Sequence, residues 1–171
     1  MSSDTAIDTR KVALRRTLRF HTLHEILRDV EQLGAVTSET GESICADGNW
    51  TPAQIVEHVT FFIDGAIDGF TFTAPLPIRV LARPFKKRIL TKPMKPGIKL
   101  PARMNVVLPD PDTTWDDAVS ALRDAVGRID IGERMTQPSP LLGAMTHEDW
   151  VKMNSPGLAL YCGMTSRIEY D

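Results

Sequence analysis

The sequence lacks most of the features that assign a chain quickly to a function. Only two of its 171 residues are cysteine, and Cys45 and Cys162 lie far apart and form no CxxC motif. This distribution excludes a disulfide framework and is typical of a reducing compartment. No apolar run approaches the roughly 18 residues of a membrane helix, and residues 1–11 lack the apolar core of a signal peptide. We therefore expect a cytoplasmic protein.

Known catalytic and binding signatures are also missing. The chain contains no nucleophile elbow, phosphate loop, dinucleotide fingerprint, zinc ribbon or HExxH motif. Its net charge of −2 gives no general attraction to nucleic acid or membrane. The length predicts a single domain over residues 1–171, of which the polar residues 1–9 are expected to be flexible. Function must therefore be sought in the arrangement of a few side chains.

The clearest local structure is a helix predicted over residues 51–68. Thr51 is a favourable N-cap, Pro52 suits the first helical position, and Gln54 can complete a capping box. Gly69 stands where a helix would end. The helix has one apolar stripe, formed by Ile55, Val56, Val59, Phe62, Ile63, Ala66 and Ile67.

Other segments also carry helical patterns. The first long helix should begin at the capping box of Thr22 and end at Gly34, and a third should begin at Thr113 or Thr114. A fourth should begin at Thr146, with an interruption at residues 156–157 and a resumed apolar pattern over 158–170. A weaker helical pattern over residues 77–90 should break near Pro84. With prolines throughout residues 91–111 and no strand of useful length, we predict an all-α antiparallel bundle with a long Pro-rich excursion between its second and third long helices.

Four histidines limit the candidate metal ligands. His58 lies at the edge of the apolar stripe, where spacing favours a half-buried residue at the rim of the core over a ligand. Spacing alone does not select its partners. The other candidates are His24, His147, Glu25, Glu57, Glu148 and Asp149.

A basic run is the other distinctive feature. No aspartate or glutamate occurs between Phe70 and Pro109. Such a run can bind a phosphate, a carboxylated ligand or an acidic partner, but a solvated surface is the favoured interpretation. Nucleic acid is not expected, because Phe85 is the one aromatic residue interleaved with the charges. The run consists of Arg79, Arg83, Lys86, Lys87, Arg88, Lys92, Lys95, Lys99 and Arg103.

Four motifs, in this order, resemble the DinB-like superfamily, and in particular an uncharacterised branch of it. They are RTLRF at 16–20, GNWTPAQIVEHV at 48–59, PLLG at 140–143 and THEDW at 146–150. The resemblance implies an up-down-down-up four-helix bundle that is often dimeric. It also implies a divalent metal, such as zinc or nickel, held by three histidines, of which His58 matches the one on the second helix. Some members transfer low-molecular-weight thiols or isomerise substrates with thiol help.

The chain departs from this pattern at the other two ligands. Counting from Trp150, the expected histidine pair falls at or near Gly157 and Tyr161, and a glycine cannot ligate. A catalytic metal site normally takes about three protein ligands. We therefore expect a small-molecule-binding bundle with a degenerate metal site, its pocket lined by Trp50, His58, Phe62, Trp150, Met153 and Tyr161. The alternative is a metal-dependent thiol transferase or isomerase in which His147, Glu57 or Tyr161 replaces the missing ligands, and a third hypothesis is a homodimer that buries the apolar stripe.

Overall fold

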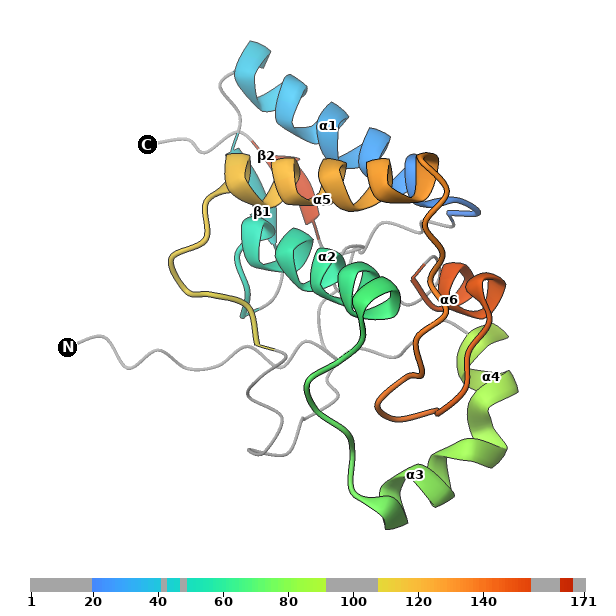
Figure 1. Ribbon diagram of the computed structural model, residues 1–171. Coiled ribbons are helices and arrows are strands. Elements are labelled where there is room, and N and C mark those ends of the chain that lie inside the picture. The colour runs from blue at the N-terminus through green and yellow to red at the C-terminus, as the bar shows by residue number, and fades with distance from the viewer. Residues whose placement is uncertain (1–19, 41–42, 47–48, 92–107, 155–163, 168–171) are drawn as a thin grey trace, which may run out of the picture.

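The computed structural model describes residues 20–40, 43–46, 49–91, 108–154 and 164–167 (Figure 1). The described chain is mainly helical, as predicted. No helix in these ranges is long and apolar enough to cross a membrane. The predicted flexible segment 1–9 and most of the Pro-rich excursion lie outside the described residues. In chain order the elements are α1 Leu23–Thr40, β1 Ser43–Ala46, α2 Pro52–Asp68, α3 Leu76–Ala82, the 3-10 helix η1 Arg83–Phe85, α4 Lys86–Thr91, α5 Trp115–Asp130, α6 His147–Asn154 and β2 Met164–Arg167.

Helix α2 begins and ends as the sequence predicts. Thr51 Oγ1 accepts a hydrogen bond from Gln54 N at 3.2 Å, and Gln54 Oε1 accepts one from Thr51 N at 2.9 Å. Both halves of the capping box are therefore formed, with Pro52 in the first turn. At the other end Gly69 adopts φ 102°, a left-handed conformation that glycine reaches without steric cost.

Helix α1 starts near its predicted cap but runs past the predicted end at Gly34. Thr22 Oγ1 accepts from Glu25 N at 3.2 Å, and the Glu25 carboxylate accepts from His21 N at 2.7 Å. A methyl group on Gly34 would lie 2.9 Å from Nε1 of Trp115. Gly34 therefore serves the close approach of α5 to α1 and does not terminate the helix.

A two-stranded sheet corrects the prediction of a chain without strands. Strand β1 pairs antiparallel with β2, with Ser43 opposite Arg167 and Ala46 opposite Met164. The first strand lies between the first two predicted long helices, and the second in residues predicted to resume a helix. The partners are more than a hundred positions apart, so this pairing depends on tertiary structure that a local pattern cannot reveal.

The predicted break near Pro84 is confirmed. Helix α3 ends at Ala82, the 3-10 turn η1 contains Pro84, and α4 follows directly. Proline cannot donate the i to i−4 hydrogen bond and crowds the preceding turn, so the α-helix is interrupted there.

The core lies between α2 and its neighbours. Helix α2 packs mainly on α5 and also contacts α6, while α5 contacts α1 and α4 contacts α6. Figure 1 shows α1, α5 and α2 as successive rods, with α3 at the end of the molecule far from α1. The third predicted helix begins at its expected cap, since Thr114 Oγ1 accepts from Asp117 N at 3.2 Å. The largest fully buried side chains are Trp150, Ile26, Ile63, Leu122, Met135, Val30, Val56 and Val126.

Candidate functional site around His58

The imidazole of His58 lies between two aromatic rings. Its centroid is 4.7 Å from the ring of Trp50 and 5.0 Å from the ring of Phe62. Phe62 is one helical turn beyond His58 on α2, which places the two side chains on the same face. Trp50 immediately precedes the Thr51 cap, so the start of the helix fixes its position. His58 is partly buried, in agreement with its predicted place at the rim of the core.

Phe70 connects this group to the buried tryptophan of α6. Its ring centroid lies 5.8 Å from Phe62 and 5.7 Å from Trp150, and it stacks on Trp150 with an interplanar angle of 26°. Trp150 is fully buried, and its Nε1 donates to the carbonyl oxygen of Gln137 at 2.9 Å. We define the aromatic–histidine row as Trp50, His58, Phe62, Phe70 and Trp150.

The structure thus brings together most of the predicted pocket residues. Trp50, His58 and Phe62 are in contact, and Trp150 joins them through Phe70. Met153 is partly buried against the hydrophobic core. Tyr161 and Gly157 lie outside the described residues. Sequence reasoning missed Phe70, although an aromatic residue directly after the helix-ending Gly69 could have suggested that the chain folds back onto α2.

The part of the chain that the structure describes does not provide the three-ligand metal site that the resemblance implies. Within the described ranges, no group of three or more His, Cys, Asp or Glu side chains is placed to hold a metal ion. Two proposed substitute ligands hold the fold instead: Nδ1 of His147 accepts from Met135 N at 3.1 Å, and Glu57 Oε2 accepts from Asp110 N at 3.1 Å. At the family positions the sequence has Gly157, which has no ligating side chain, and Tyr161. No reaction step through a metal follows from these residues.

His24 is likewise engaged at a helix contact. Its Nε2 lies 2.8 Å from Oδ1 of Asp130, which joins α1 to the end of α5. Both side chains are about half exposed. This pair therefore belongs to the surface and not to the site around His58.

A charged cluster borders the aromatic–histidine row. Arg128 on α5 donates to Asp68 Oδ2 at 2.7 Å, to Asp64 Oδ1 at 3.1 Å and to Glu133 Oε2 at 2.7 Å. Burial raises the pKa of Asp64, and this effect outweighs the opposing attraction of Arg128. Hydrogen bonds from Arg128 lower the pKa of Asp68. Arg128 lies 64 positions from Asp64 and 60 from Asp68, so the sequence gives no local signal that would have predicted these pairs.

A small open cavity of about 220 Å³ lies where this cluster meets the aromatic residues. The cavity wall contains two acids, Asp64 and Asp68, and Arg128 forms an ion pair with each. The charges at this polar edge are therefore largely neutralised. Phe70 belongs both to the cavity wall and to the aromatic–histidine row. The wall is formed by Phe61, Asp64, Gly65, Asp68, Gly69, Phe70 and Thr71.

Fold and site together define a mainly helical protein with an aromatic–histidine row at the face of its central helix. A family model described as "Protein of unknown function (DUF1569)" matches residues 12–159. The chain belongs to this family. Searches of curated proteins and of solved structures find no match.

Proposed function

We propose that this chain is a cytoplasmic, DinB-like protein that binds a small molecule at His58, with a degenerate metal site. The observation that carries the proposal is the position of the His58 imidazole between Trp50 and Phe62. Small-molecule sites combine mainly apolar and aromatic walls with a few polar groups that fix orientation. Here the aromatic rings provide the wall, and an imidazole nitrogen provides a hydrogen bond. A low-molecular-weight thiol or an aromatic compound is the class of ligand that these groups suit.

The chemistry of His58 supports recognition more than catalysis. A neutral imidazole offers one donor and one acceptor, whereas the protonated form offers two donors. A single imidazole supplies one of the roughly three ligands that a catalytic metal normally needs. A ligand held by stacking on Trp50 and by a hydrogen bond to His58 requires no further group.

Histidine ring spectra test this proposal directly. The chain has four histidines, so the ring nitrogens of 15N-histidine-labelled protein give a simple spectrum. Titration with a fragment library that includes glutathione and indole carboxylates should shift the His58 signals. The His58→Gln variant should weaken a hit about tenfold, the value of one hydrogen bond to a ligand. The matched control His24→Gln should leave the affinity for the same ligand unchanged. Ligands that bind without shifting the His58 signals would contradict the proposal.

Metal analysis distinguishes the proposed binding protein from the alternative, a metal-dependent enzyme. Protein purified without a histidine tag should contain less than one equivalent of zinc or nickel. A stoichiometric metal that is lost in His58→Ala but kept in His24→Ala would favour the metal-dependent thiol transferase or isomerase instead. Light scattering of the same samples tests the homodimer that the DinB-like resemblance implies.

A further inference from the structure

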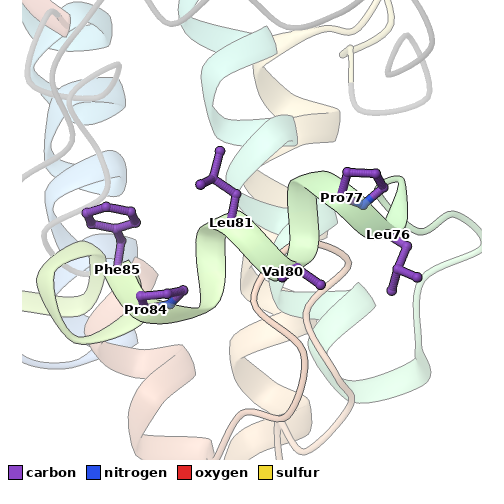
Figure 2. Close-up of a pocket in the computed structure, with 6 residues that line it drawn as sticks. All are labelled: Leu76, Pro77, Val80, Leu81, Pro84 and Phe85. Carbon is purple, nitrogen blue, oxygen red and sulfur yellow. The ribbon is translucent and has the colours of Figure 1, made fainter.

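The segment Leu76–Thr91, comprising α3, η1 and α4, exposes a continuous apolar stripe. The exposed fractions are 68% for Leu76, 56% for Val80, 70% for Leu81 and 52% for Phe85. Leu76 and Val80 are four residues apart, as are Leu81 and Phe85, so the two members of each pair lie near each other along the segment. Figure 2 shows Leu81 and Phe85 projecting in the same direction, away from the ribbon. Together with Pro77 and Pro84 they line an open groove of about 680 Å³.

Lys86 turns toward the protein and Arg83 approaches it, whereas Lys87 and Arg88 are exposed. Lys86 Nζ donates to the carbonyl oxygen of Ala144 at 2.7 Å and lies 2.9 Å from Oδ2 of Asp149. A methyl group on Gly143 would lie 3.7 Å from Nη2 of Arg83. A surface helix normally buries its apolar stripe and exposes its charges. Helix α3 instead exposes Leu76, Val80 and Leu81, and large exposed apolar patches mark interaction sites.

Charge on the segment has one sign. It holds five basic residues and no acid, and this local charge contrasts with the chain's net charge of −2. Of these, Lys86 pairs with Asp149, and within the described residues no carboxylate forms an ion pair with the other four. Arg79 Nε is buried and has no hydrogen-bond partner in the same residues. The surface therefore suits a partner that is both apolar and anionic.

Geometry selects among such partners. All the groove-lining residues come from one continuous segment, so a docked peptide helix would lack the second wall of a helix-binding groove. A second copy related by a two-fold axis would bring two sets of cations together. A bilayer needs only one face, and an amphipathic helix with Leu and Phe beside Lys and Arg is the pattern that lies in the membrane interface. Figure 1 places α3 at an outer end of the molecule, where a flat surface can reach it.

We infer that the segment Leu76–Thr91 is an interfacial anchor for anionic phospholipid bilayers. Leu76, Val80, Leu81 and Phe85 enter the acyl boundary, and the exposed Lys87 and Arg88 contact lipid phosphates. The low net charge predicted no general attraction to membranes, but local charge decides interfacial binding because fields are screened within about 10 Å at ordinary salt. The inference is independent of the site at His58.

Vesicle co-sedimentation tests the anchor. Full-length protein should sediment with phosphatidylglycerol-containing vesicles at low salt, and binding should weaken as salt is added. Vesicles of phosphatidylcholine alone should bind at least about fivefold less. Leu76→Ser/Leu81→Ser should lower the partition coefficient by about tenfold or more, because it removes two apolar side chains from the interface. Both leucines are exposed in the free protein, so the variant should fold, as circular dichroism would verify.

Matched controls separate the anchor from general effects. Ile131→Ser removes another large apolar residue, 81% exposed but outside the segment, and should bind like the wild type. Arg88→Gln should weaken binding about fivefold, whereas Arg123→Gln, which removes the same charge from α5, should change it much less. Equal losses in segment and control variants, or no binding to anionic vesicles, would overturn the inference. So would a wild-type dimer that ignores vesicles and dissociates in Leu76→Ser/Leu81→Ser, because the stripe would then hold a second copy.

Discussion

The ring of Phe70 lies directly against Gly65 of α2. A methyl group on Gly65 would fall 2.3 Å from Cε1 and 2.6 Å from Cζ of Phe70. No side chain other than hydrogen fits between the helix and this ring. The missing side chain at position 65 therefore lets Phe70 reach both Phe62 and Trp150, and it completes the aromatic–histidine row.

Replacing Gly65 by alanine should destabilise the protein, although alanine favours helices. The methyl group must displace the Phe70 ring, and such overpacking costs about 1–3 kcal/mol. Gly127 of α5 is the matched control, because nothing lies within 4 Å of a methyl group placed there. Gly127→Ala should stabilise the protein by about 0.5–1 kcal/mol. Urea denaturation measures both changes, and a gain in stability for Gly65→Ala would refute the proposed role of Gly65.

A pH prediction concerns the start of α6. Asp149 completes the capping box with Thr146, and the hydrogen bond from Lys86 lowers the pKa of its carboxyl. A lowered carboxyl pKa contributes stability above the unfolded value, near 3.9, that is lost as pH falls through the folded pKa. Asp149→Asn should therefore be less stable than wild type at pH 7 by about 1 kcal/mol. The difference should shrink with acidification, and thermal unfolding between neutral and acidic pH measures it.

His147 should respond to pH in a different range. Burial lowers its pKa, and Nδ1 accepts a hydrogen bond from Met135 N at 3.1 Å, so the neutral Nε2–H tautomer is required. The unfolded chain takes up a proton near pH 6.5, before the folded chain does. The resulting stability is present above that pH and is lost between the unfolded and folded pKa values. The stability of His147→Gln should fall less with pH over this range than that of wild type, whereas the stability of exposed His21→Gln should fall as much. An unchanged dependence of stability on pH in His147→Gln would contradict the assignment.

Local signals in the sequence predict the helix starts well. Thr51, Thr114 and Thr146 each cap the helix expected of them, and Pro84 breaks the chain where proline must. These features depend on residues within one helical turn, so they can be identified without knowledge of the fold. The prediction that His58 sits at the rim of the core holds for the same reason.

Features that depend on contacts between residues far apart in the sequence cannot be predicted from local patterns. Gly34 resembles a helix terminator, but Trp115 on another helix explains it. The β1–β2 pairing joins segments from opposite ends of the chain, and neither strand is strong by itself. Phe70 has its role because Gly65 and Trp150 are close in space. The DinB-like resemblance places Trp50, His58 and Phe62 in one expected pocket, but it does not indicate the charged cluster beside them.

That cluster leads to the last prediction. Arg128 binds Asp64, Asp68 and Glu133 across α2, α5 and the following loop, with 28% of its own side chain exposed. Replacing it leaves three acids close together, so Arg128→Gln should destabilise the protein by about 1–2 kcal/mol, a value reduced because the acids are partly in solvent. Arg123 forms a single exposed pair with Glu31 at 2.8 Å. Arg123→Gln should therefore cost at most about 0.5 kcal/mol.

The pH dependence of stability shows whether Arg128 acts through its charge or through packing. In Arg128→Gln the repulsion among the remaining carboxylates should be relieved as they take up protons, so the gap to wild type should narrow between neutral pH and pH 4. Wild type should lose the contribution of Asp68 only at lower pH, because Arg128 lowers the pKa of Asp68 and this stability disappears as pH falls from the unfolded value, near 3.9, through the folded value. Added salt should also reduce the gap. A gap that is constant in pH and salt would mean that Arg128 stabilises the α2–α5 contact through its aliphatic stem and not through its charge.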